Sequence, residues 1–145
     1  EAFEEISSRH AGRFDLVTSN IPFGDVTVFD VGYANGKDKL KRQACRTLHT
    51  YFFVKALDQV RDGGLVAFVT TDSLLNAPAH EPIRKYLVRQ ANLVSAVRLP
   101  HNLFTEFAGT SAGSDLVVLQ KASGKTSLSE NERLFVRSET RGGLL

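Results

Sequence analysis

The sequence has a single cysteine, no methionine, no tryptophan and no long apolar run. With only Cys45 available, a disulfide within the chain is excluded, and a reducing cytoplasm is the expected location. No apolar stretch approaches the roughly 20 residues of a membrane span, and no signal peptide is visible, so no membrane partner is expected. The chain begins at Glu1 without an initiator methionine, and we therefore take it to be a piece of a longer protein.

Strong net charge and metal-ligand spacing are also missing. A net charge of +2 is too small to argue for nucleic-acid binding by itself. The four histidines are scattered and, with one cysteine, give no zinc spacing, so no metal site is expected and His49 is interpreted as structural. Gly124-Lys125-Thr126 is similar to the end of a phosphate-binding loop, but Leu119 stands where that loop needs a glycine. The composition is that of an ordinary globular protein. The chain is long enough to form one domain with a real core.

The most informative stretch is a short apolar strand that runs directly into a turn. Residues 14–19 have the pattern of a buried parallel strand, and Asn20-Ile21-Pro22-Phe23 follows them. In open α/β sheets, ligands bind beyond the carboxyl ends of the strands. There, the Asn20 amide oxygen and the Ile21 carbonyl could accept both N–H bonds of an exocyclic amine while Phe23 stacks on its ring. The alternative is a plain turn, because Asn and Pro are common in turns.

Apolar periodicity predicts the remaining elements of an α/β chain. Asp38 is a plausible N-cap for a long helix over 39–61, and Gly63 is its expected left-handed stop. Arg84 is expected on the outer side of a later helix. The other predicted helices cover about 1–10 and 81–91 and a short segment after the capping box at Ser129 to Glu132. The other predicted strands cover 65–69, 93–99 and 115–121, of which the last two form a closing antiparallel pair.

Basic residues gather at the start of the helix expected over 39–61. Cations at a helix N-terminus oppose the helix dipole, so the cluster gains little stability locally. A surface that faces phosphates would explain it, and a solvated helix face is the alternative. The candidate DNA-binding residues are Lys39, Lys41, Arg42 and Arg46.

The turn at Asn20 resembles the Asn-Pro-Pro-Tyr/Phe motif of the amino-methyltransferases, above all the adenine-N6 DNA methyltransferases. Ile21 stands where that family usually has its first proline, which keeps the carbonyl acceptor but loosens the backbone restraint. The resemblance covers roughly residues 12–137, through the segments 62–70, 99–104, 108–110 and 114–121. Together these look like the C-terminal half of the catalytic domain in the large methylase–helicase proteins of bacterial mobile elements.

This resemblance implies a fold and an activity. The fold would be part of a Rossmann-like α/β sheet of an S-adenosylmethionine-dependent methyltransferase, over residues 1–137, with a frayed tail at 138–145. The activity would be methylation of the N6 amine of adenine in DNA, with a catalytic turn formed by Asn20, Ile21, Pro22 and Phe23. Around the flipped base, Asp72 and Phe104 would join Phe23. For Asp72 the alternative is a helix cap, and for Phe104 it is a core anchor.

The resemblance also implies a cofactor and partners. The cofactor would be S-adenosylmethionine, but no Gly-x-Gly sequence occurs for its loop. We therefore expect that loop upstream, together with weak or no cofactor binding by this piece. The expected partners are DNA and the rest of a parent chain, including a helicase domain. Two alternatives stay open, namely methylation of a glutamine amide or an RNA amine, and a non-catalytic scaffold with a degenerate motif.

Overall fold

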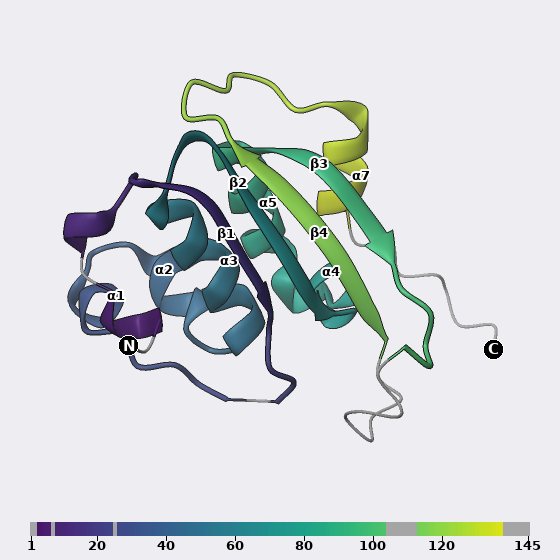
Figure 1. Ribbon diagram of the computed structural model, residues 1–145, viewed down its shortest axis with the longest axis horizontal. Coiled ribbons are helices and arrows are strands. Elements are labelled where there is room, and N and C mark those ends of the chain that lie inside the picture. Colours follow the sequence, from purple (N-terminus) through teal and green to yellow (C-terminus); the bar gives the residue numbers. More distant parts are fainter. Residues whose placement is uncertain (1–2, 7, 25, 104–112, 138–145) are drawn as a thin grey trace.

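A computed structural model describes residues 3–6, 8–24, 26–103 and 113–137 of the chain. Four strands form one mixed sheet in the order β1-β2-β4-β3 (Figure 1). Their bounds are β1 Phe14–Asn20, β2 Val60–Thr71, β3 Ala91–Arg98 and β4 Ser114–Lys121. β1 runs parallel to β2, whereas β4 is antiparallel to both of its neighbours. The predicted α/β class and closing antiparallel pair are therefore confirmed.

α-Helices of the described segments cover one face of this sheet (Figure 1). The helical elements of these segments are the 3-10 turns η1 Phe3–Glu5, η2 Ser8–His10 and η3 Pro78–His80, and the α-helices α1 Val31–Asn35, α2 Lys39–Ala44, α3 Leu48–Gln59, α4 Ser73–Asn76, α5 Glu81–Gln90 and α7 Glu130–Val136. The two N-terminal 3-10 turns replace the helix expected over 1–10, so that prediction was wrong. The capping box is confirmed, because the Glu132 N–H donates to Ser129 Oγ and the Ser129 N–H to the Glu132 carboxylate.

The core lies between the sheet and α3. Alternate residues of a strand face opposite sides, and on the helix side Val66, Phe68, Val117 and Leu119 are completely buried. The Phe53 ring of α3 meets the Phe68 ring edge to face, with the ring centroids 5.0 Å apart. This packing fixes α3 across the sheet and so fixes which residues of α3 lie at each end of the strands.

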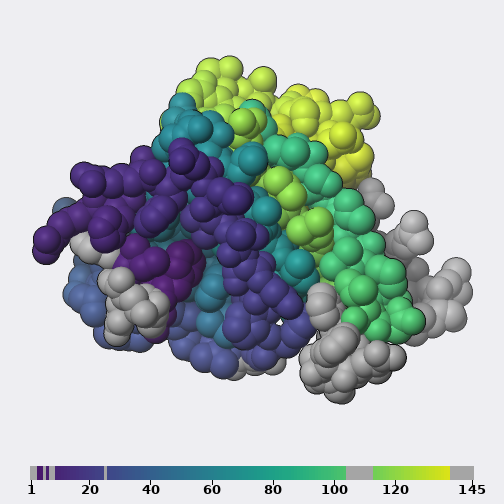
Figure 2. Space-filling model, in the orientation of Figure 1, coloured from purple at the N-terminus to yellow at the C-terminus, as the bar shows by residue number. Residues whose placement is uncertain are grey.

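The other face of the sheet has no covering helix among the described elements. Figure 2 shows this face, on which the four strands lie side by side. Leu16, Leu65 and Val97 are between 38% and 53% exposed there, although they are apolar strand residues. This side is called the open face below.

The helix predicted over 39–61 is two helices and the start of a strand, so that prediction was wrong. α2 ends at Ala44 and α3 begins at Leu48, because the Thr47 hydroxyl accepts the Thr50 N–H at 3.2 Å and caps a new helix. Gly63 does have a left-handed backbone, with φ of 79°, but it lies within β2 rather than at a helix end. It marks an irregular stretch where the β1–β2 register shifts.

Arg84 is completely buried rather than on the outer side of α5, so that prediction was also wrong. Its Nη1 donates to the carbonyl oxygens of Leu74 and Ala77, both at 2.9 Å, and its Nη2 donates to that of Val136 at 3.3 Å. Burial lowers the pKa of this guanidinium. The planar fork satisfies the carbonyls of three residues from two segments at once, which is what allows a charged group to lie inside the helical layer.

No helix in the part of the chain that the structure describes is long and apolar enough to cross a membrane. The expected frayed tail at 138–145 lies outside the described residues.

Candidate functional site

The candidate turn begins at the carboxyl end of β1. Asn20 pairs with Val69 of β2, and the Ile21 N–H donates to the Val69 carbonyl oxygen at 3.0 Å. Because successive strand residues face opposite sides, Asn20 lies exposed on the open face whereas Ile21 is completely buried in the core. The carboxamide of Asn20 is therefore accessible beside a backbone that the Ile21 side chain anchors.

Pro22 is exposed and Phe23 is half-buried. The Phe23 ring lies against the imidazole of His49, with the ring centroids 6.2 Å apart and the planes tilted by 42°. The structure thus brings together at one edge of the sheet an accessible amide and an aromatic ring from the same four-residue turn.

His49, in the first turn of α3, joins this edge, although its sequence context predicted only a structural role. Its Nδ1 lies 2.8 Å from the Thr70 hydroxyl oxygen and accepts the Thr71 N–H at 3.4 Å. The signal that could have found it is topological. A helix that leads into a parallel strand must begin near the carboxyl edge of the sheet, so its first turn lies beside the ends of the strands.

Asp72 directly follows β2, so it lies at the same edge as Asn20. Its side chain makes no capping hydrogen bond to α4, so the capping interpretation was wrong. Its backbone N–H donates to the Gly113 carbonyl at 3.0 Å, and a Cβ built on Gly113 would lie 2.6 Å from Asp72 Oδ2. The carboxylate therefore rests directly on Gly113.

Arg98 is the charged neighbour of this carboxylate. It makes a bidentate pair with the buried Asp115, with N–O distances of 2.9 and 3.1 Å. The hydrogen bonds to Asp115 raise the pKa of the Arg98 guanidinium, and Asp72 adds a smaller contribution of the same sign. Phe104, the other expected pocket residue, lies outside the described residues.

The candidate DNA-binding residues lie on or just after α2. Lys41 pairs with Asp58 at 2.8 Å, and Arg42 donates to the Gly36 carbonyl oxygen, whereas Lys39 and Arg46 are exposed. Asp58 lies near the end of α3, and His49 lies in its first turn, about 14 Å away along the axis at 1.5 Å per residue. Lys41 therefore lies toward the opposite end of α3 from the turn. Contact of the four residues with phosphates stays a prediction.

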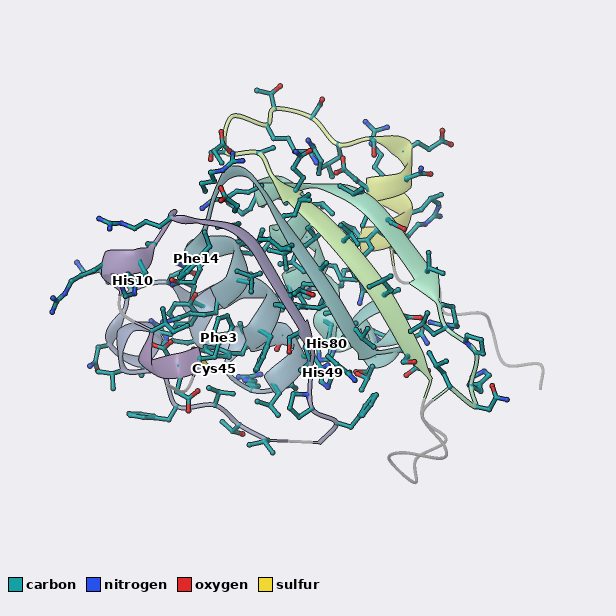
Figure 3. All side chains as sticks on the ribbon, in the orientation of Figure 1. Phe3, His10, Phe14, Cys45, His49 and His80 are labelled. Carbon is teal, nitrogen blue, oxygen red and sulfur yellow. The ribbon has the colours of Figure 1, made fainter. Side chains whose placement is uncertain are left out.

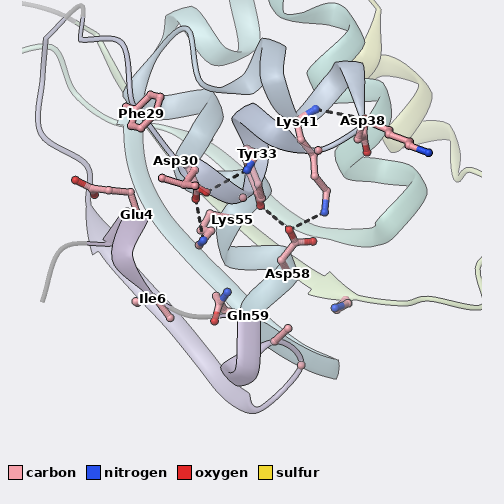
Figure 4. Close-up of a pocket in the computed structure, with 17 residues that line it drawn as sticks. Glu4, Ile6, Phe29, Asp30, Tyr33, Asp38, Lys41, Lys55, Asp58 and Gln59 are labelled. Atoms are coloured by element: carbon pink, nitrogen blue, oxygen red, sulfur yellow. Dashed lines mark hydrogen bonds and ion pairs between the residues drawn. The ribbon is translucent and has the colours of Figure 1, made fainter.

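A large cavity of about 1320 Å³ lies at the other end of α3 from the candidate turn (Figure 4). Within it, Lys55 pairs with Asp30 at 2.9 Å, and the Tyr51 hydroxyl donates to Asp30 at 2.7 Å. Burial raises the pKa of Asp30, but these two donors and the Tyr33 N–H outweigh it and hold the pKa below its ordinary value. The lining has four lysines and four carboxylates, so it has no net charge with which to attract an ion: Lys37, Lys41, Lys55, Lys121, Glu4, Asp30, Asp38 and Asp58.

The described segments contain neither a metal-binding cluster nor a glycine-rich turn directly after β1 or β2. They contain no group of three or more His, Cys, Asp or Glu side chains that could hold a metal ion. The turns after β1 and β2 are residues 20–24 and 71–72, and neither is rich in glycine. These residues therefore do not fit a nucleoside cofactor by themselves.

Comparisons with known proteins identify the family of this chain. The model of a family described as N-6 DNA Methylase matches residues 1–142. Defense against restriction protein B of Escherichia phage P1 is 29% identical over 123 residues, which cover 82% of this chain but 5% of that protein.

Solved structures show the same fold. A proposed class I S-adenosylmethionine-dependent methyltransferase from Listeria monocytogenes matches with a TM-score of 0.60 and 19% identity, over 80% of this chain and 34% of that one. The M protein of the type I restriction enzyme EcoKI matches with a TM-score of 0.60 and 18% identity, over 83% and 23%. The chain thus has the sheet of S-adenosylmethionine-dependent methyltransferases and spans between 5% and 34% of the length of each of these relatives.

Proposed function

The chain belongs to the N-6 DNA methylase family, and from this membership we propose that it forms the substrate half of a site that methylates the N6 amine of adenine in DNA. The methyl donor is S-adenosylmethionine, held by a part of the parent protein outside this chain. One observation carries the proposal: the accessible Asn20 amide and the half-buried Phe23 ring share the carboxyl edge of the sheet.

The chemistry of the amine explains the need for this turn. The lone pair of an exocyclic adenine amine is delocalised into the ring, so the nitrogen is a poor nucleophile. Two acceptors, Asn20 Oδ1 and the Ile21 carbonyl oxygen, bind both amine hydrogens and favour a pyramidal nitrogen with an exposed lone pair. The remaining effect is positioning of that nitrogen against the methyl group.

The target base must leave the duplex to reach this edge. Phe23 stacks on the flipped base, a contact of about 1–3 kcal/mol, and Pro22 restricts the turn. Asp72 borders the base pocket, and Lys39, Lys41, Arg42 and Arg46 contact phosphates. Residues 1–137 form one structural unit of a longer cytoplasmic protein that contains a helicase domain.

Substitution of Asn20 tests the assignment in the longest natural protein that contains this chain. We expect Asn20→Ala to lower methyl transfer to DNA by about 100- to 1000-fold, because one of two acceptors is lost. Asn20→Asp keeps an acceptor oxygen and should retain more activity. Thr18→Ala is the matched control, since Thr18 is also exposed on β1, and it should stay within about twofold. Unchanged methylation by Asn20→Ala would favour a scaffold, and transfer to RNA or to a glutamine amide instead of DNA would favour those substrates.

Cofactor binding by the isolated 145-residue chain is a separate test. We expect calorimetry to find weak or no binding of S-adenosylmethionine, because no Gly-x-Gly sequence occurs in the chain. Micromolar affinity would contradict the division of the site between two parts of the parent protein.

A further inference from the structure

We propose that His49 is a positioning residue that holds the Phe23 ring in the place where the target base stacks. The inference rests on the proposed function and deepens it, because it explains how the ring of an exposed turn acquires a defined position. His49 acts through Phe23 and does not touch the reacting atoms.

The first argument is that His49 is itself fixed. It is 4% exposed, and it lies in the first turn of α3 next to the Thr47 cap. Its Nδ1 accepts the Thr71 N–H and lies 2.8 Å from the Thr70 hydroxyl. A backbone N–H can only donate, so Nδ1 is an acceptor and the proton of the neutral ring lies on Nε2. The imidazole therefore has one tautomer and one orientation relative to the end of β2.

The second argument is where the ring of His49 lies. Figure 3 labels it near the ends of β1 and β2, and its centroid is 6.2 Å from that of Phe23, within the range of aromatic pairs. Phe23 comes three residues after the end of β1, where no strand pairing restrains it. A fixed imidazole beside the ring is a contact that restrains the position of the ring.

The same packing separates His49 from an acid–base role. The imidazole is buried, and its Nδ1 already contacts the Thr70 hydroxyl and accepts the Thr71 N–H, so we assign it no contact with the reacting atoms. Its contribution to methylation is therefore geometric. In well-oriented active sites, a displacement of about 1 Å changes rates by about 100-fold, so a geometric role predicts a large effect.

A fluorescent reporter tests the contact without any assay of activity. The chain has no tryptophan, so Phe23→Trp introduces a single one. His49→Asn keeps an acceptor near the Nδ1 position but removes the ring, and we expect it to raise acrylamide quenching of the tryptophan at least twofold. His80→Asn is the matched control, because His80 lies at the same end of the sheet and its Nδ1 contacts the Ser73 carbonyl oxygen at 3.0 Å. Equal quenching in all three proteins overturns the proposal.

A second variant keeps the proposal testable if the His49→Asn protein does not fold. If His49→Asn lacks the far-ultraviolet circular dichroism of the parent, His49→Phe is used, which keeps a ring and removes the acceptor. The ring then contacts the tryptophan without its anchor, and we expect a broader distribution of fluorescence lifetimes. A lifetime distribution identical to that of the histidine protein overturns the proposal.

A double-mutant cycle then tests whether His49 acts through Phe23. In the longer parent protein we expect His49→Asn to lower kcat/KM for DNA methylation by about 10- to 100-fold. In a Phe23→Ala background the same substitution should change kcat/KM less than threefold. Independent, multiplying effects overturn the proposal. Failure of the proposed function looks different, since Asn20→Ala would then leave methylation unchanged while the tryptophan reporter still responds to His49.

Discussion

Ile21 donates its backbone N–H to the carbonyl oxygen of Val69 across 3.0 Å, one residue beyond the end of β1. The Ile21 side chain is completely buried at the same point. The bond and the burial together fix the backbone from which the candidate turn starts. Asn20 is consequently held on the open face, because its neighbour faces the core.

Restoring the proline that the resembled motif usually has at position 21 should therefore destabilise this chain. Proline has no N–H to donate to Val69 and fills less of the core than isoleucine. We expect Ile21→Pro to lower the free energy of unfolding by about 2–4 kcal/mol in urea denaturation. Pro22→Ala, at an exposed neighbouring position, should change it by less than about 1 kcal/mol. Equal effects of the two substitutions would show that Ile21 is not the anchor.

The free energy of unfolding should fall in acid, in part because of Asp30. Burial raises the pKa of this carboxyl, but Lys55, Tyr51 and the Tyr33 N–H together hold it below the ordinary 3.8. A lowered folded-state pKa stabilises the fold above the unfolded-state value, and this contribution is lost as the pH falls through the folded-state value. Urea denaturation at a series of pH values from about 5 downward should show the decline.

Asp30→Asn should remove the Asp30 part of that pH dependence. The variant also leaves the buried Lys55 without its carboxylate, so we expect the free energy of unfolding at neutral pH to fall by about 3–5 kcal/mol. Below pH 4 the difference between the two proteins should narrow, because protonation of Asp30 weakens the same pair in the parent. Curves that stay parallel down to pH 2 would contradict this account.

Arg84 should be among the most sensitive charged positions. Lysine cannot reach the three carbonyls that the guanidinium fork satisfies, so we expect Arg84→Lys to lower the free energy of unfolding by about 2–4 kcal/mol. Arg89→Lys on the same helix is the control, and it should have almost no effect because Arg89 is exposed. Chemical denaturation measures both free energies of unfolding. An Arg84→Lys protein as stable as the control would show that the hydrogen bonds from Arg84 to the three carbonyl oxygens do not stabilise the fold.

The capping box of α7 offers a smaller, local test. Ser129→Ala removes the acceptor of the Glu132 N–H and should cost about 1 kcal/mol, which is a few degrees in the thermal midpoint. Ser127→Ala, two residues earlier and exposed, should leave the midpoint unchanged. A similar fall in both variants would indicate an effect of the whole loop rather than of the cap.

The parts of this fold that are predictable from sequence are those that neighbouring residues decide. The strand expected over 14–19 and the cap at Asp38 follow from apolar pattern and capping chemistry, and both are present. The expected burial of this strand was wrong, because β1 lies at the edge of the sheet and none of its residues is buried. The break at Thr47 was missed because the apolar face of α3 continues the pattern of the preceding turn. Arg84 was misplaced because its burial depends on carbonyls from segments up to 52 residues away.

The candidate site, like the fold, was predictable from the sequence only in part. The residues 20–23 were found as a motif that resembles a known one, and their catalytic role remains a proposal. The sequence by itself determined the α/β class, the strand that leads into this turn and the identity of the chemical groups it offers. Only the tertiary structure decided that Asn20 faces outward while Ile21 is buried, and that His49 meets both Thr70 and Phe23. The reason is physical, because local preferences act between neighbours along the chain, whereas these contacts arise only when α3 packs across the finished sheet.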